Sequence, residues 1–368
     1  ACYSEDTQTL TENGWKYYWE IKDEKVATFN PETGKIEYHN PIKKLVYEHD
    51  GKMYHYFTPK GVDLLVTPEH RIWYKKTFEE KWNLEPAKDI KFSRVDFLAV
   101  AGWDGEEKEE ITINENIKFK MDDWLEFLGY FVSEGYVAIP ENTNKGFRIQ
   151  ITQKDKKKVN KIQKCLQNLG LSFKSYFSKN DECTIFLIHN KELWSWLREN
   201  IGTHSFNKKM PDFLKMLSYR QLEIFFNAYM LGDGYYGKRE TDHNATATTI
   251  SKELADDLQE IGLKLGYKTK LKSILSDNPK RADKYRLDFV INDQAKKDWA
   301  TPRIDLKKNL KIEQYKGFVY CFEVPNHLFI TRRNGVVAIQ GNTPEIQQGI
   351  VSKRARTLGE LELVSAKV

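Results

Sequence analysis

The chain has 368 residues, 40% hydrophobic and 13% aromatic, enough for two or three domains with buried cores. Its mean hydropathy is −0.65, and no apolar run approaches the roughly 18 residues of a membrane span, which excludes a helical membrane protein. The net charge of +5 is compatible with a nucleic-acid partner, and four scattered cysteines without a CxxC pair indicate neither a zinc site nor a disulfide framework. The polar, acidic start does not resemble a signal peptide, so we expect a cytoplasmic protein.

The first part of the chain has the pattern of short β-strands. KVATFNPETGKIEYHN predicts a strand–turn–strand with Pro31 to Gly34 at its tip, and KMYHYFTPKGVDLLV predicts a second pair. Next, DDWLEFLGYFVSEGY has apolar residues at helical spacing from Trp124 to Val132, and this helix is expected to end at Gly135. Strand-like residues return near the end, in FVYCFEV and GVVAIQ. We therefore expect a β-rich unit that is split by an inserted α/β unit.

The middle of the chain contains an internal repeat. FLGYFVSEGY (127–136) is matched by AYMLGDGYY (228–236), each a helix end with an acid directly before glycine. TQKDKKKVNKIQKCLQNLGL likewise matches TISKELADDLQEIGLKLGY, and TIFLIHNKELWSW matches RLDFVINDQAKKDW, at nearly the same offset. The pattern predicts two copies of helix–strands–helix–strands–helix, related by a pseudo-twofold axis.

The two acids of the repeat, Glu134 and Asp233, are candidate metal ligands. Small neighbours such as Gly129 and Gly232 allow two helices to pack closely, which would bring the two carboxylates together at the helix ends. Adjacent carboxylates repel each other unless a cation lies between them, and Mg²⁺ or Mn²⁺ there can activate water for attack on a phosphodiester. The alternative is that both are ordinary exposed acids.

LGYFVSEG and YMLGDG resemble the two motifs of LAGLIDADG homing endonucleases, over residues 118–304. The resemblance implies an α/β fold of two αββαββα units that form a saddle, with β-ribbons in the major groove of double-stranded DNA. It implies Glu134 and Asp233 as ligands at the cleavage centre of a monomeric enzyme. Glutamate at the first position departs from the commoner aspartate but keeps the carboxylate.

Further basic residues are candidates for this site. NKKMPDFLKML resembles the family's lysine–proline block, which implies Lys208 (or Lys209) near the scissile phosphate, unless it is a solvated lysine. A second such lysine is expected at Lys307 or Lys308. Basic residues of the expected ribbons are candidate DNA contacts: Arg148, Lys174, Lys268, Lys270, Lys272 and Arg286.

The outer segments carry a second set of motifs. CYSEDTQTLTENG begins at Cys2, GVDLLVTPEHRIW contains Thr67 and His70, and FVYCFEVPNHLFITRRNG precedes the final QGNT. A lone motif of this kind is weak, because a single histidine on a strand is more often structural. In this order, however, they resemble the splicing blocks of inteins, over residues 2–342. The resemblance implies an all-β, horseshoe-shaped splicing domain of the Hint type, shared with hedgehog autoprocessing domains.

The resemblance implies the domain boundaries. The segments are one upstream host (extein) residue at position 1, a splicing domain at 2–110 and 305–342, an endonuclease at 111–304 and a downstream extein segment at 343–368. The flanking exteins would be partners in cis.

The residue types suit splicing at the first junction. The Cys2 thiol can attack the carbonyl of Ala1 and convert the amide into a thioester. His70 can protonate the departing nitrogen, and Thr67 can help to hold the amide.

At the second junction, Thr343 then attacks the thioester through its hydroxyl. Asn342 cyclises through its side-chain amide and cuts the bond to Thr343, and an acyl shift joins Ala1 to Thr343. No cofactor is needed for these steps.

Two positions depart from the intein pattern. Gly341 stands where histidine is usual before the final asparagine, so help for Asn342 is expected from elsewhere, with His327 as the candidate. Cys321 stands where aspartate is common. It is interpreted as an acid or base or as an alternative nucleophile, although Cys2 favours the standard route, and a small buried hydrophobe is the plain alternative.

Three other functions stay open: an intein whose endonuclease only binds DNA, an autoprocessing domain that cleaves without ligation, and a maturase or regulator. The two acids argue against the first, the Asn342–Thr343 pair against the second, and the splicing motifs at both ends against the third.

Overall fold

The computed structural model describes residues 2–59, 61–138, 146–237, 244–291 and 302–342. The chain forms two compact units. The first comprises residues 1–103, 266–270 and 290–368, and the second comprises residues 104–265 and 271–289. The first unit is thus assembled from both ends of the chain. Among the described residues, none of the helices combines the length and the apolar character needed to cross a bilayer.

The first unit is built almost entirely of strands. They are β1 (Tyr3–Ser4), β2 (Gln8–Thr11), β3 (Gly14–Lys16), β4 (Val26–Asn30), β5 (Lys35–His39), β6 (Lys43–Thr58), β7 (Val62–Val66), β8 (Arg71–Lys76), β9 (Trp82–Pro86), β10 (Arg94–Asp96), β21 (Arg303–Asp305), β22 (Leu310–Glu323), β23 (Leu328–Arg333) and β24 (Val336–Gly341). Short helical turns lie at Tyr18–Glu20, Ala87–Asp89 and α8 (Leu306–Asn309). Strands β1, β22, β6 and β7 close into a barrel, β21, β10, β8 and β9 form a sheet, and β24, β23, β2, β4 and β5 lie in order in a third.

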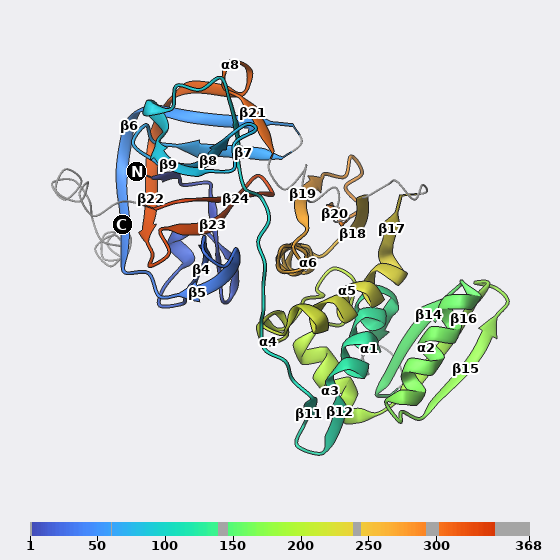
Figure 1. Cartoon of the computed structure of the whole chain (residues 1–368). Coiled ribbons are helices and arrows are strands. Elements are labelled where there is room, and N and C mark those ends of the chain that lie inside the picture. The colour runs from blue at the N-terminus through green and yellow to red at the C-terminus, as the bar shows by residue number, and fades with distance from the viewer. Residues whose placement is uncertain (1, 60, 139–145, 238–243, 292–301, 343–368) are drawn as a thin grey trace, which may run out of the picture. The chain divides into compact units, whose positions relative to one another are not determined.

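A long ladder joins the two ends of the chain in this unit. β6 and β22 pair antiparallel from Lys43 opposite Glu323 to Tyr56 opposite Leu310, and they run side by side as the blue and red ribbons of Figure 1. The core beneath them is aromatic and aliphatic. It includes Tyr3, Val66, Ile72, Tyr320, Phe322 and Phe329. Burial of these side chains stabilises the first unit and keeps β6 and β22, from the two ends of the chain, packed on the same core.

The second unit contains the repeat, apart from residues 268–270 and Val290, which belong to the first unit. After the hairpin β11 (Glu110–Ile113) and β12 (Ile117–Lys120), the first copy comprises α1 (Met121–Glu134), β13 (Gly135–Val137), β14 (Arg148–Gln153), α2 (Lys156–Asn168), β15 (Phe173–Ser178), β16 (Cys183–His189) and α3 (Lys191–Asn200). The second comprises α4 (Asp212–Lys215), α5 (Tyr219–Asp233), β17 (Gly234–Tyr236), β18 (Asn244–Thr249), α6 (Lys252–Lys264), β19 (Lys268–Ile274) and β20 (Lys284–Val290). Both copies order their strands alike, β13-β14-β16-β15 and β17-β18-β20-β19. The final helix predicted for the second copy lies outside the described residues.

Helices α1 and α5 pack against each other with almost no side chains between them. A Cβ atom on Gly129 would lie 2.4 Å from Cβ of Ala228 and 2.7 Å from the backbone nitrogen of Tyr229. A Cβ atom on Gly232 would lie 2.1 Å from Oγ of Ser133. The close approach expected from the small residues of the motif is therefore confirmed.

The glycines after the two acids end the helices for a reason other than the one expected. Gly135 is the C-cap of α1 but has an extended backbone, with φ −104°, rather than a left-handed one. Its requirement is space, because a Cβ atom there would lie 2.7 Å from the carbonyl oxygen of Phe131. Gly234 caps α5 in the same way, with Met230 as its neighbour.

Candidate functional site

The two acids of the repeat lie at equivalent places. Glu134 is the last residue of α1 and Asp233 the last of α5, and a Cβ atom on Gly232 would lie 3.0 Å from Cγ of Glu134. Asp233 is exposed as a residue, but its carboxyl lines a hollow with Lys208 and Thr249. Withdrawal of this carboxyl from solvent and the negative charge of Glu134 raise the pKa of Asp233 to about 6. The structure thus brings the two predicted carboxylates together.

This pair fits a hard divalent cation. Glu134 accepts a hydrogen bond from Nε2 of Gln153 at 3.2 Å, which orients its carboxylate. Among the described residues, no group of three or more His, Cys, Asp and Glu is placed to hold a metal. Two carboxylates alone leave positions for water and phosphate oxygens, which is how Mg²⁺ is usually held in nucleic-acid enzymes.

The charge of Glu134 can be tested through its neighbour. In metal-free solution, Glu134→Gln is expected to lower the pKa of Asp233 from about 6 toward its usual range, because the repulsion disappears. Carboxyl titration by NMR measures this shift. Glu126→Gln, a change on the same helix, should leave the pKa of Asp233 unchanged, and an unchanged value in Glu134→Gln would show that the two carboxyls do not interact.

Lys208 is placed differently from the expectation for a lysine at the scissile phosphate. It is 3% exposed, and its Nζ donates to the carbonyls of Phe131, Val132 and Gly135 at 3.1, 2.6 and 2.8 Å. These carbonyls end α1, where helices leave acceptors unpaired and favour a positive charge. Burial lowers the pKa of Lys208 to about 8, against the opposing effect of the two acids. Lys208 therefore holds the helix end that carries Glu134.

We predict that Lys208→Met destabilises the second unit by about 3 kcal/mol or more, because the carbonyls at the end of α1 lose a buried, charged donor. Thermal unfolding followed by circular dichroism measures the effect. Lys209→Met is the matched control, because Lys209 is exposed. Equal Tm values for the two variants would contradict the capping role.

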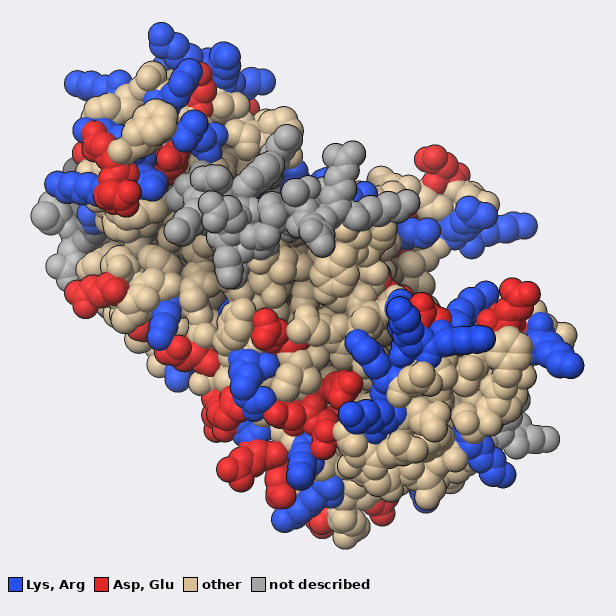
Figure 2. Space-filling model, turned by 45° about the vertical axis from the view of Figure 1, so that its right-hand side comes forward, with Lys and Arg blue, Asp and Glu red and all other residues tan. Residues whose placement is uncertain are grey.

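The predicted DNA contacts are placed unevenly. Arg148 lies on β14 and Lys174 is exposed on β15 of the first sheet. On the second sheet, Asp288 accepts from Lys272 Nζ and Arg286 Nε, both at 2.9 Å, so it orients these two cations. Figure 2 shows Lys and Arg side chains gathered on the right-hand part of the lower body, and Asp and Glu toward its left.

Three other lysine expectations are placed differently by the structure. Lys268 is only 9% exposed, with its amine against Gly61, and the exposed amine of Lys270 donates to the carbonyl of Pro59 at 2.5 Å. Lys307 and Lys308 lie on α8 in the first unit, not in the second unit with Glu134 and Asp233.

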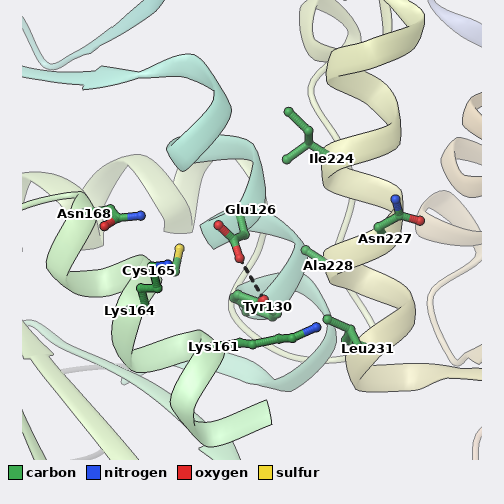
Figure 3. A pocket seen from close by; sticks show the side chains of 10 residues that line it. All are labelled: Glu126, Tyr130, Lys161, Lys164, Cys165, Asn168, Ile224, Asn227, Ala228 and Leu231. Carbon is green, nitrogen blue, oxygen red and sulfur yellow. Dashed lines mark hydrogen bonds between the residues drawn. The ribbon is translucent and has the colours of Figure 1, made fainter. Parts of the chain in front are cut away.

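A cavity of about 440 Å³ lies between α1, α2 and α5 (Figure 3). Glu126 accepts from the hydroxyl of Tyr130 there, and the side chain of Lys161 extends toward Leu231. Burial raises the pKa of Cys165 far above its usual value, so this thiol is not a nucleophile. The cavity therefore offers no catalytic set of its own.

In the first unit, Thr67 forms two hydrogen bonds with the backbone of Cys2. The Cys2 N–H donates to Oγ1 of Thr67 at 2.8 Å, and the Thr67 N–H donates to the Cys2 carbonyl at 2.9 Å. Both residues are 1% exposed. The turn continues with the His70 N–H, which donates to the carbonyl of Thr67 at 2.9 Å. The nitrogen of the predicted scissile bond is thus fixed in a buried site.

The Cys2 thiol lies beside two side chains. Cys321 and Tyr47, from the β6–β22 ladder, interact with this thiol. Burial raises the pKa of the Cys2 thiol, whereas Cys321 and Tyr47 lower it. Sequence reasoning missed Tyr47, an ordinary strand aromatic without a local signal.

His70 is completely buried and neutral. Burial, with the positive charge of Arg71, lowers the pKa of His70 well below its usual value. Neither ring nitrogen has a hydrogen-bond partner among the described residues. The ring packs edge-on against Tyr3, with centroids 4.5 Å apart. Unpaired buried ring nitrogens in this site are free to receive or deliver a proton.

Asn342 directly follows the last residue of β24 and is buried. Its N–H donates to the carbonyl of His327 at 3.0 Å and its Nδ2 to the carbonyl of Val324 at 3.2 Å, while Oδ1 has no partner among the described residues. His327 has a left-handed backbone, with φ 58°, and an exposed side chain. It therefore supports Asn342 through its backbone, whereas the expectation was for its ring. Ala1 and Thr343 lie outside the described residues.

Comparison with known families identifies the second unit. Residues 125–202 and 221–297 match a family model described as a LAGLIDADG-like domain. The first stretch contains Glu134 and the second Asp233. The chain therefore contains a LAGLIDADG-like domain of α/β architecture.

Curated relatives are longer proteins with unrelated names. An ATP-dependent Clp protease proteolytic subunit of Chlamydomonas moewusii is 29% identical over 290 residues, with 72% of this chain and 28% of that protein covered. An RNA polymerase subunit beta C-terminal section of Stigeoclonium helveticum is 27% identical over 432 residues, covering 98% and 39%. A ribonucleoside-diphosphate reductase subunit beta of Aquifex aeolicus is 22% identical over 366 residues, covering 93% and 50%. The chain thus spans half or less of the length of these three relatives.

Two solved structures show likenesses of different extent. I-DmoI in complex with DNA and Mn is 14% identical, with a TM-score of 0.35, and 49% of this chain and 94% of that chain are covered. The AceL NrdHF class 3 split intein is 11% identical, with a TM-score of 0.32 and coverage of 93% and 99%.

Proposed function

We propose that the chain is an intein whose first unit splices the flanking host segments and whose second unit cuts double-stranded DNA at a specific site. The observation that supports splicing most directly is the double hydrogen bond between Thr67 and the peptide of Cys2, in a buried site that also contains His70. The scissile nitrogen, a nucleophilic thiol and a proton carrier are thus held by one body.

In the first step, the Cys2 sulfur bonds to the carbonyl carbon of Ala1 while the bond to the Cys2 nitrogen breaks. The thiol proton ends on that nitrogen, and the unpaired ring of His70 is the group that can transfer it. Cys321 and Tyr47 favour the thiolate, because both lower the pKa of the Cys2 thiol. The product is a thioester.

In the next steps, the hydroxyl of Thr343 attacks the thioester and its proton passes to the leaving thiolate. Nδ2 of Asn342 then bonds to the carbonyl carbon of Asn342, the bond to the Thr343 nitrogen breaks, and the freed amine takes the proton. That amine finally attacks the ester carbonyl carbon, the bond from this carbon to the Thr343 side-chain oxygen breaks, and a proton passes from the nitrogen to that oxygen. A peptide bond between Ala1 and Thr343 remains. Each step transfers one acyl group, so no energy source is needed.

The relatives support an inserted element. Their names share no activity, and the chain matches only a part of each. A segment that recurs within proteins of unrelated names is expected of an element that moves between host genes.

The second unit is proposed to cleave DNA with Glu134 and Asp233 as ligands of a divalent cation. Such a cation supplies an activated water and stabilises charge on the phosphate. Lys208 positions the end of α1, and the cations of the two sheets, such as Lys174 and Arg286, contact phosphates. An endonuclease that only binds DNA remains the second candidate for this unit.

The test is expression of residues 1–368 between two folded reporters, followed by heating and intact mass measurement. Ligated reporters and a free fragment from Cys2 to Asn342 are the expected products. Reporters that separate without ligation would instead identify an autoprocessing domain, and an unchanged precursor would refute splicing.

A further inference from the structure

Tyr3 connects the residues of the two predicted junctions. It directly follows Cys2 and is fully buried, in register with Tyr320 of β22 and Val66 of β7. Its hydroxyl donates to the carbonyl oxygen of Gly341 at 3.0 Å, and its ring packs edge-on against His70. Burial raises the pKa of Tyr3 well above its usual value, so the hydroxyl keeps its proton and remains a donor.

The Gly341 position has no room for a side chain. A Cβ atom there would lie 2.3 Å from the carbonyl oxygen of Arg71 and 2.9 Å from Cδ1 of Leu84. The first of these neighbours is backbone and cannot move aside cheaply. A side chain at position 341 therefore cannot assist Asn342 in this protein, and any support for the Gly341–Asn342 peptide must come from another strand.

Glycine leaves that peptide unusually free to rotate in the absence of support. Cyclisation requires Nδ2 of Asn342 to reach the carbonyl carbon of the same residue, which depends on the backbone geometry at Asn342. The N–H of Asn342 is fixed by the carbonyl of His327 and the preceding carbonyl by Tyr3. Both ends of the Gly341–Asn342 peptide plane are thus held, by two different segments.

We propose that Tyr3 is a positioning residue for asparagine cyclisation, whose hydroxyl fixes the Gly341–Asn342 peptide in the geometry from which Nδ2 attacks. This inference rests on the proposed splicing function. Because Gly341 has no side chain, the Gly341–Asn342 peptide at the second junction needs support from another residue. The inference assigns this support to Tyr3, which lies next to the first junction.

The test compares Tyr3→Phe with Tyr320→Phe in the full chain between two reporters. Tyr320 is the matched control, because it is equally buried and packs against Tyr3, but its hydroxyl donates to the carbonyl of Thr7 instead. In the Cys2→Ala background, which isolates cyclisation, Tyr3→Phe should slow cleavage after Asn342 by about tenfold, because a misplaced reacting group loses much of its effective concentration. Tyr320→Phe should stay within twofold.

A second readout separates positioning from general damage. In the Asn342→Ala background, thiol-induced cleavage before Cys2 measures thioester formation, and Tyr3→Phe should leave it within twofold. Equal cyclisation rates for the two Phe variants would overturn the inference, and so would a parallel loss of both steps with a lower Tm. If the unsubstituted chain cleaves at neither junction, the splicing function itself is wrong.

Discussion

Cys2→Ala is expected to abolish ligation, with a fall of more than about 1,000-fold in the rate of spliced product, because no thioester can form. Cleavage after Asn342 should persist, since cyclisation needs no thiol. Intact mass spectrometry of the reporter fusion distinguishes the two products. Cys321→Ala should still splice, roughly three- to tenfold more slowly at pH 7, because loss of the Cys321 side chain raises the pKa of the Cys2 thiol.

The remaining two cysteines provide controls for these variants. Cys165 and Cys183 are buried in the second unit, and their replacement by alanine should leave splicing unchanged. The opposite pattern, in which Cys321→Ala abolishes ligation and Cys2→Ala splices, would identify Cys321 as the nucleophile. That result would favour the alternative route over the thioester at Cys2.

Glu134→Gln and Asp233→Asn are each expected to lower DNA cleavage by about 1,000-fold or more, because a single carboxylate no longer holds the cation. Binding to the same DNA should persist, as measured by mobility shift without added metal. Splicing should be unaffected, because the contacts around Cys2 and Asn342 all lie within the first unit. Glu126→Gln is the control on α1, since Glu126 contacts Tyr130 rather than Asp233.

Stability provides an independent readout of the same pair. The folded-state pKa of Asp233 is raised to about 6, above its unfolded value, so its ionisation costs stability as the pH rises through about 4 to 6. Asp233→Asn should therefore raise the Tm of metal-free protein at pH 7 and leave it unchanged near pH 3.

DNA cleavage that survives in both Glu134→Gln and Asp233→Asn would contradict the metal assignment.

The acids could be predicted from the sequence because a repeat makes position informative. Glu134 and Asp233 are each the last residue of a helix with a buried apolar face. The small residues between the two helices can be recognised directly in the sequence. The approach of α1 to α5 follows from them, because glycine is the residue that permits such contact. The strand pairs of the first unit were equally local, each a hydrophobic run interrupted by a turn.

Contacts between distant segments left no such trace. A capping lysine and a solvated lysine look alike in sequence, so the role of Lys208 depends on carbonyls more than 70 residues away. The reason for Gly341 lies in the backbone of Arg71. Tyr3 and Tyr47 look like ordinary core aromatics. Only the folded chain shows that the Tyr3 hydroxyl donates to Gly341 and that Tyr47 interacts with Cys2.

A buried ionic cluster in the second unit was likewise unpredictable. Nζ of Lys215 lies 2.7 Å from Asp257 and 3.1 Å from Glu260, and Glu260 also accepts from Lys264. Charged residues are usually exposed, so the sequence of α6 alone would place Asp257, Glu260 and Lys264 in solvent. In the structure all three are buried. Their mutual neutralisation is a property of the assembled repeat.

The ladder between β6 and β22 can form only late in the synthesis of the chain. Its first register pair joins Lys43 to Glu323, which leave the ribosome 280 residues apart. At the usual 5 to 20 residues per second, about 14 to 56 s pass between them. Cys321 lies on β22, so it cannot contact Cys2 until this strand has been synthesised and has paired with β6. If the first unit splices as proposed, a host segment upstream of Cys2 would therefore have at least that interval to fold before its junction could react.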